Sequence, residues 1–265
     1  MNFAIVRKTL RDRWRSTTAW AVGLLSIISL QLYIYPTVAN SSDAMTQYID
    51  AFPEALKTIF RIEDYISGPG FLGTELFSLM IPLIFVSLAA SRGSSAIAGE
   101  VEAGTADILF ALPISRTKIL VSKLFAMVVE IAGLSIVAVA SIAIGASIVN
   151  LEISAISLIT ATSSSGLMGL VFGSIALFAG SFTGKRSIAT GLAITFAIAA
   201  LLFYSLAPIV NTFDYLTPFN PMDWAINGNP LANGISAFAF VKLTSAFAGF
   251  SALAIFLFRK RDIKA

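Results

Sequence analysis

Long runs of residues without a single charge constrain this chain more than any other feature of its sequence. Residues 17–38 and 153–184 contain no Asp, Glu, Lys or Arg. A helix that crosses a bilayer needs about 20 predominantly apolar residues. Charged residues make up 12% of the chain, whereas a typical soluble domain has about 25%. The sequence therefore predicts an all-α membrane protein, because a helix satisfies its own backbone hydrogen bonds in lipid.

Six apolar segments predict six transmembrane helices within a single transmembrane domain that covers residues 1–265. The expected spans lie at about 17–38, 72–91, 124–149, 155–180, 188–210 and 236–258. We expect the two longer connections, 40–71 and 211–235, to be extracytoplasmic loops.

Three local features refine this picture. Apolar residues at positions 52, 56, 59 and 60 predict an amphipathic helix in the first loop. Residues 67–70 read Ser-Gly-Pro-Gly and predict a turn. Pro82 is expected to kink the second span, because proline lacks a backbone N–H and crowds the preceding turn.

The placement of the basic residues predicts the orientation. Of the 18 Lys and Arg residues, 15 precede the first span, follow the second or fourth, or follow the sixth. Cytoplasmic loops carry an excess of Lys and Arg. We therefore expect a multi-pass protein of the cell membrane with both termini in the cytoplasm, and a cytoplasmic connection between the second and third spans.

Residues 1–16 predict a short amphipathic helix of their own. Arg7, Arg11 and Arg15 give it a cationic face, and Trp14 continues an apolar stripe that begins at Phe3. Such a helix lies among the headgroups of an anionic leaflet. The alternative is that these charges only set the topology of the first span.

Several function classes are excluded. The chain contains no His and no Cys, which rules out His-based catalysis and disulfides. Residues 180–186 are one position too short for a phosphate-binding loop and have Arg where Ser or Thr is needed. We therefore expect no catalytic residue, no metal and no directly bound cofactor. Nucleic-acid binding is not expected, because the basic residues flank spans and form no basic domain.

The polar segment between the second and third spans predicts a helix, a break, a short helix, a second break and a further helix. Gly104 should interrupt the helix that ends near Glu102, and Thr105 can cap a short helix with Asp107 in its first turn. Leu109 and Leu112 give that short helix an apolar side.

Pro113 should end the short helix, and Ser115 can cap the helix that becomes the third span. An apolar face displayed in water needs a groove to cover it. That groove belongs either to a partner protein or to the inner ends of this protein's own spans.

This segment resembles the signature of ABC-2-type transporter permeases, E-x-x-x-G-T-x-x-x-L-x-x-x-P-x-S-R. The matching residues are Glu100, Gly104, Thr105, Leu109, Pro113, Ser115 and Arg116. The resemblance implies that the short helix is a coupling helix that docks on a separate ATPase subunit, which binds ATP and Mg²⁺. It also implies that two permease copies work together and that residues 1–16 form an elbow helix against membrane lipid.

Ionisable and small residues inside the spans supply the remaining candidates. Glu130 lies within the third span, where it either borders a transport path or reaches toward Lys123 or the cytoplasmic interface. Glu75 and Lys242 lie at similar depth near the outer side, so they could pair. Gly169 and Gly173 belong to a stripe of small residues that lets two helices approach closely, within one subunit or between two.

These observations favour the permease subunit of an ATP-driven exporter. A motor-independent channel or ion-coupled carrier is the alternative, and it would need polar groups in its path, for which Glu130 is the candidate. A membrane scaffold or insertion factor is a weaker possibility.

Overall fold

The computed structural model describes residues 1–60, 62, 64–106, 113–213 and 215–260. Six helices in it are long and apolar enough to cross a membrane. They are α1 (Phe3–Asn40), the continuous helix 68–102, α7 (Arg116–Ile148), α8 (Ala155–Thr183), α9 (Arg186–Leu206) and α12 (Ala237–Lys260). The helix 68–102 consists of α4 (Gly68–Leu72), the π-helix η1 (Gly73–Met80) and α5 (Ile81–Glu102). The prediction of an all-α membrane protein with six spans is confirmed.

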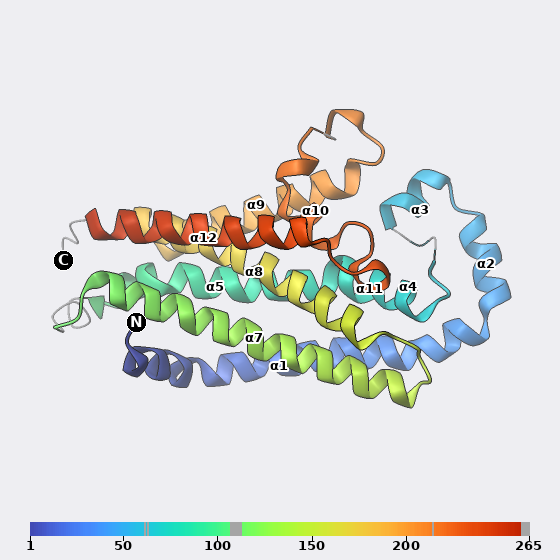
Figure 1. Cartoon of the computed structure of the whole chain (residues 1–265), viewed down its shortest axis with the longest axis horizontal. Helices are drawn as coiled ribbons and strands as arrows, with labels where there is room; N and C mark the ends of the chain where they lie inside the picture. Colours follow the sequence, from blue (N-terminus) through green and yellow to red (C-terminus); the bar gives the residue numbers. More distant parts are fainter. Residues whose placement is uncertain (61, 63, 107–112, 214, 261–265) are drawn as a thin grey trace.

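The long helices run side by side along one axis, with α5 and α8 between α1 and α7 on one side and α9 and α12 on the other (Figure 1). In the most apolar stretch of α8, 72% of residues are buried inside the protein, against 17% for α12. Helices α5 and α8 are thus the core of the bundle. We call the end where α1 begins and α12 ends the terminal end.

Helices α5 and α8 pack with almost no space between their backbones. A methyl group added to Gly93 would lie 1.9 Å from the carbonyl oxygen of Gly173. A methyl group added to Gly169 would lie 2.9 Å from backbone atoms of Phe85. Small residues permit such close approach in lipid. The predicted stripe of small residues on α8 therefore packs within this chain, against α5.

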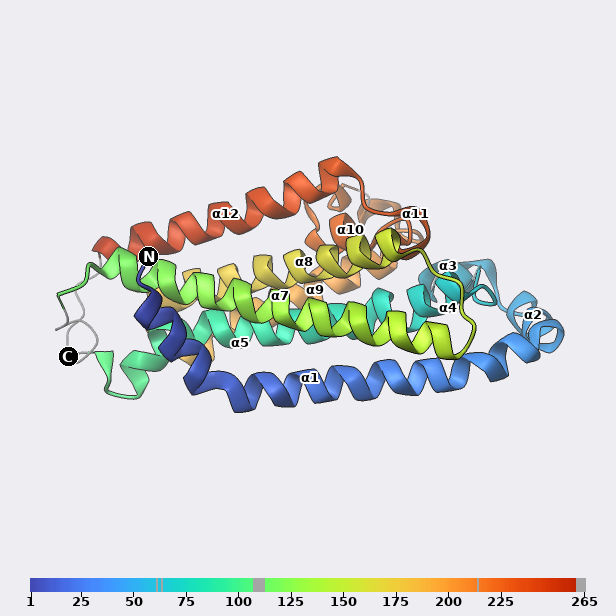
Figure 2. The same ribbon diagram turned by 60° about the horizontal axis from the view of Figure 1, so that its bottom comes forward.

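Residues 3–40 form one unbroken helix, although the sequence suggests a separate helix over residues 1–16. Figure 2 shows that the first turns of α1 run at an angle to the rest of it. These turns bury Ile5, Val6 and Thr9 and leave Phe3 and Trp14 exposed. The helix therefore presents only part of the expected apolar stripe to the bundle.

The irregular part of the second span lies just before Pro82. Residues 73–80 adopt π-helical geometry, and the N–H of Ile81 donates to the carbonyl of Leu76. Pro82 follows Ile81 directly within the same continuous helix, where it supplies no N–H to the preceding turn. The wider turn of the π-helix accommodates the proline, so the expected distortion appears as a change of helix type.

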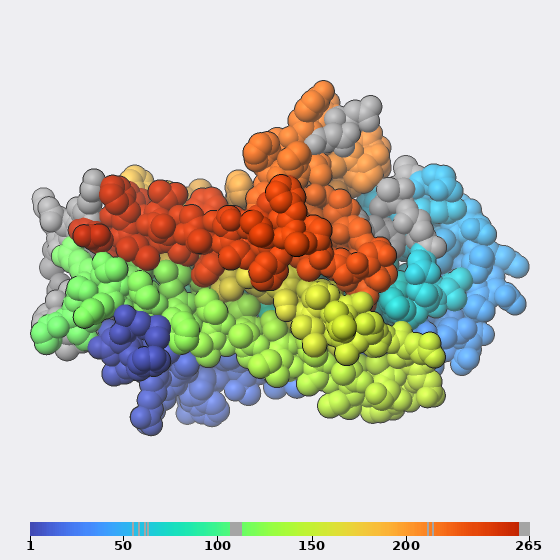
Figure 3. Space-filling view, in the orientation of Figure 1, coloured from blue at the N-terminus to red at the C-terminus, as the bar shows by residue number. Residues whose placement is uncertain are grey.

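Both longer connections contain short helices at the end opposite the terminal end. The first contains α2 (Ser42–Asp50) and α3 (Glu54–Phe60). The second contains η2 (Asn211–Phe213), η3 (Thr217–Phe219), α10 (Pro221–Ile226) and α11 (Pro230–Asn233). The segment between α9 and α10 projects from the side of the bundle (Figure 3).

Two local predictions in the first connection are wrong in detail. Phe52 lies outside the predicted amphipathic helix, because Pro53 separates α2 from α3 and cannot donate the backbone hydrogen bond that would join them. Residues 67–70 do not form a turn. The Ser67 hydroxyl instead accepts the N–H of Gly70 at 2.9 Å and caps α4.

Candidate functional site

The connection between α5 and α7 has the boundaries that the sequence predicts. Helix α5 ends at Glu102, and Gly104 adopts a left-handed conformation with φ +66°, which glycine tolerates without strain. Ser115 is the N-cap of α7, and its hydroxyl accepts the N–H of Lys118. The predicted breaks on both sides of the connection are confirmed.

The short helix predicted between these breaks, with Asp107, Leu109 and Leu112, lies outside the described residues. On the described flanks, Gly104, Thr105, Pro113 and Ser115 are exposed, whereas Ala106 is buried.

Glu100 ties the end of α5 to the start of α7. Its Oε1 accepts the Lys123 ammonium at 2.5 Å, and its Oε2 accepts the Thr105 hydroxyl. Lys123 also donates to the carbonyl of Ala96 at 2.7 Å, and only 5% of Lys123 is exposed. A buried ammonium needs such partners, because an unpaired charge away from water is costly. The prediction that Glu130 reaches toward Lys123 is therefore wrong, because Lys123 forms its ion pair with Glu100.

Glu102 ties the same end of α5 to α9. Its Oε1 accepts the backbone N–H of Arg186, the first residue of α9, at 2.7 Å. The first N–H groups of a helix have no partner within that helix, and the helix dipole favours an anion there. Glu102 thus serves as a cap for α9 from a different helix.

Deeper in the bundle, Arg92 of α5 forms an ion pair with Glu130 of α7. Arg92 is 6% exposed and Glu130 4%. The Arg92 guanidinium also donates to the hydroxyls of Thr17 at 3.1 Å and Ser16 at 3.4 Å on α1. Glu130 Oε1 is buried without a hydrogen-bond partner among the described residues. Three helices therefore meet at one buried ion pair.

This pair was missed by sequence reasoning, which placed Arg92 at the cytoplasmic edge. The two residues lie at similar distances from the terminal end of the bundle. Helix α5 continues for ten residues beyond Arg92, and Glu130 lies about two helical turns after Lys123 in α7. Two opposite charges at similar depth on neighbouring spans are candidates for pairing.

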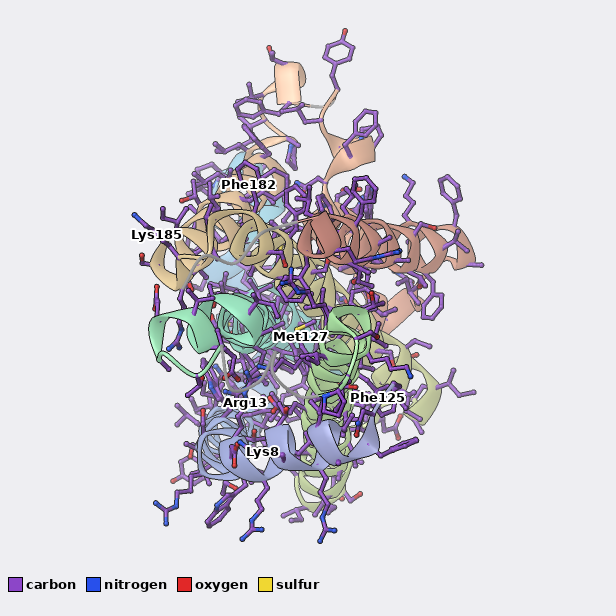
Figure 4. The ribbon with its side chains drawn as sticks, turned by 90° about the vertical axis from the view of Figure 1, so that its left-hand side faces the viewer. Lys8, Arg13, Phe125, Met127, Phe182 and Lys185 are labelled. Atoms are coloured by element: carbon purple, nitrogen blue, oxygen red, sulfur yellow. The ribbon has the colours of Figure 1, made fainter. Side chains whose placement is uncertain are left out.

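The first turns of α1 cross the terminal end of the bundle. Figure 4, which looks along the long axis, shows them lying crosswise below the other helices, with Arg13 directed toward the bundle. Arg13 donates to the Ser95 hydroxyl at 3.0 Å, and the N–H of Asn2 donates to Ser122 at 2.8 Å. The residues of the predicted elbow surface, Arg7, Arg11, Trp14 and Arg15, are all exposed.

Glu75 and Lys242, which the sequence suggests as a pair, each contact other residues. Glu75 accepts hydrogen bonds from Tyr65 at 2.6 Å and from Gln31 at 3.3 Å. Lys242 Nζ lies 4.6 Å from the ring centre of Phe238 and 3.4 Å from the carbonyl oxygen of Pro218. The suggested pairing of Glu75 with Lys242 is therefore absent from this structure.

Within the described part of the chain, no group of three or more His, Cys, Asp or Glu side chains could hold a metal ion. The charged groups of the terminal end are arranged to hold helices together. The end of α5, just before the α5–α7 connection, is joined through them to α7 and α9. Deeper in the bundle, the Arg92–Glu130 ion pair joins α5 to α7, and Arg92 also contacts α1.

Comparison with known proteins gives one family match. The model of a family described as "ABC-2 family transporter protein" matches residues 3–263. No curated protein matches the chain. The matched residues include all six long helices and the whole α5–α7 connection.

Proposed function

Because the chain belongs to the ABC-2 family of transporter proteins, we propose that it is the membrane subunit of an exporter driven by a separate ATPase subunit. Family membership and the six apolar helices identify a multi-pass membrane permease of an ABC transporter. Export, the coupling route and the makeup of the complex are the proposal. ATP and Mg²⁺ are bound by the ATPase, and the permease has no enzymatic activity of its own.

The observation that carries the proposal is the anchoring of the end of α5, where the connection 103–115 begins. Glu100 holds Lys123 of α7, and Glu102 holds the first N–H of α9. A displacement of this connection therefore acts on α5, α7 and α9 together. We propose that the ATPase docks here, that ATP binding draws two ATPase subunits together, and that the connection carries this motion into the spans.

The proposed complex contains two permease copies and two ATPase copies. Both permease termini face the cytoplasm of the cell, as the placement of the basic residues suggests. The exposed Arg7, Arg11, Trp14 and Arg15 contact the headgroups of the inner leaflet. An ion-coupled carrier is less well supported, since its candidate group, Glu130, is neutralised by Arg92.

The test is a single change in the coupling segment. Leu109→Asp places a charge on the apolar side expected from the sequence and should abolish co-purification of the co-expressed ATPase, while the permease still inserts in the membrane. The matched control is the same change at Leu216, an exposed residue near the opposite end. ATP-driven accumulation of fluorescent lipophilic compounds in inside-out vesicles checks the direction. A Leu109→Asp complex that still assembles and transports would refute the docking claim.

A further inference from the structure

A cleft of about 690 Å³ opens at the end of the bundle opposite the terminal end. It lies between α2 and α3 on one side, η1 on another and the last turn of α9 on a third. Its lining is mainly apolar and aromatic, and includes Tyr48, Phe52, Tyr65 and Tyr204. A volume of this size falls within the range of small-molecule sites, which are concave and mostly apolar with a few placed polar groups.

Among the described residues that line this apolar cleft, Glu75 carries the one carboxylate. The Tyr65 hydroxyl donates to its Oε1 at 2.6 Å, and the Gln31 amide donates to its Oε2 at 3.3 Å. Both donors are neutral, and no described Lys or Arg forms an ion pair with Glu75. The hydrogen bonds therefore position the carboxylate without cancelling its charge.

The dipole of the helix that carries Glu75 does not stabilise this negative charge. Glu75 lies more than one turn after Gly68, where the continuous helix 68–102 begins, and the favourable effect of a helix dipole is confined to the first turn. The carboxylate lies in the π-helical segment, and such segments occur frequently at functional sites. Burial, followed by the hydrogen bond to Glu75, raises the pKa of Tyr65, so its phenol remains a donor at neutral pH.

The surroundings of Glu75 favour one class of ligand. A negative charge in a poorly solvated site attracts cations and repels anions more strongly than in water. Aromatic faces add to this preference, because their electron-rich faces attract cations. Tyr48 and Phe52 form an edge-to-face pair with ring centres 5.2 Å apart on this wall. The apolar remainder of the lining suits a bulky hydrocarbon or aromatic body.

We propose that this cleft binds an amphipathic organic cation, with Glu75 as the counter-ion and the surrounding rings in contact with the apolar body of the ligand. The inference names a substrate class for the transporter and therefore rests on the proposed function. Binding itself, however, requires only the permease.

The test uses tetraphenylphosphonium and tetraphenylborate, which share a shape and carry opposite charges. Calorimetric titration of the purified full-length permease in detergent should show saturable binding of the phosphonium. Glu75→Gln retains the size of the side chain and removes its charge. We expect it to weaken phosphonium binding by about tenfold or more, the effect of losing one favourable charge interaction, and not to weaken borate binding.

Two further variants keep the test decisive. Glu152→Gln makes the same chemical change at an exposed residue of the α7–α8 loop and should leave both affinities unchanged. Leu79→Trp, at a partly exposed position on η1, fills the cleft and should weaken phosphonium binding even if Glu75→Gln does not fold. Monodispersity on size exclusion confirms that each variant used is folded.

Three results would overturn the inference: equal phosphonium affinity in Glu75→Gln and the wild type, unchanged affinity in folded Leu79→Trp, or no saturable binding by the wild type. Failure of phosphonium to stimulate ATP hydrolysis by the assembled complex would overturn its assignment as a substrate. These results are separable from the proposed function. Absent binding with intact ATPase association refutes only this site, and intact binding with absent association refutes only the coupling proposal.

Discussion

The two ends of the bundle hold their helices by different means. At the terminal end, ion pairs and charged caps join α5 to its neighbours: Arg92 to Glu130, Lys123 to Glu100, and Glu102 to the start of α9. At the opposite end, short helices and aromatic rings surround a cleft whose described lining includes the carboxylate of Glu75. Buried opposite charges join the long helices at one end. At the other end Lys57 pairs with Asp50 and Glu54 of the short helices, whereas Glu75 has no basic partner among the described residues. The first arrangement suits transmission of motion, and the second suits binding.

The strongest test of this contrast removes the cation of the buried ion pair. Arg92→Met leaves the Glu130 carboxylate buried and unpaired, which should lower the free energy of unfolding by about 3–5 kcal/mol. Denaturant or thermal unfolding of the purified protein in detergent measures the loss. Arg11→Met, at an exposed position on α1, is the control and should change little. The double variant Arg92→Met/Glu130→Met should recover most of the stability, and strictly additive losses would argue against the pair.

A smaller effect is expected at the other ion pair of the terminal end. Lys123→Met removes the charged donor to Glu100 and to the carbonyl of Ala96, and should cost about 1.5–3 kcal/mol. Hydrogen exchange should quicken over residues 97–102, because the end of α5 loses its attachment to α7. Lys118→Met, exposed on the same helix, serves as the matched variant. Unchanged exchange over residues 97–102 would mean that Glu100 does not anchor α5.

The smallest effect is expected at the cleft. Tyr65→Phe removes one hydrogen bond to the partly exposed Glu75 carboxylate and should cost about 1.5 kcal/mol at neutral pH, the low end of the range for hydrogen bonds to charged groups. The pKa of Tyr65 is raised in the folded protein, so its contribution is complete below the unfolded value of about 10 and is lost as the pH rises above it. The stability difference between wild type and variant should therefore shrink above about pH 10.

Unfolding measured from pH 7 to 11 tests this dependence. Tyr33→Phe provides the reference, because Tyr33 is 82% exposed. A difference between wild type and Tyr65→Phe that stays constant across this range would show that the Tyr65 phenol does not stabilise the fold through Glu75.

The sequence signals that succeeded are those whose physics is local. Gly104 marks the end of α5 because left-handed backbone favours glycine, and Ser115 marks the start of α7 because its own hydroxyl caps that helix. The failures at residues 52 and 67–70 are also local. At residue 52, the apolar periodicity predicts a continuous helix, but Pro53 breaks it. At residues 67–70, the Gly and Pro content predicts a turn, but Ser67 caps a helix.

The candidate site was only partly predictable. Glu100 is recognisable from the signature, and Glu102 lies two residues after it, but their partners are 23 and 84 residues away along the chain. Likewise, Glu75 meets Gln31, 44 residues away, only because α1 lies beside η1 at that depth. Such contacts depend on the rotation and relative depth of whole helices, which no local pattern specifies.

The sequence by itself determined that this protein is a bundle of six membrane-spanning helices, because only helices that satisfy their own hydrogen bonds can carry such long uncharged runs through lipid. It also determined where the α5–α7 connection begins and ends. Tertiary structure alone decided which of the charges named above pair with an opposite charge among the described residues. Packing brings Arg92 to Glu130 and Lys123 to Glu100, and it leaves Glu75 facing a cleft with neutral hydrogen-bond donors. The reason is physical: the fate of a charge in a membrane protein depends on what the neighbouring helix presents at the same depth.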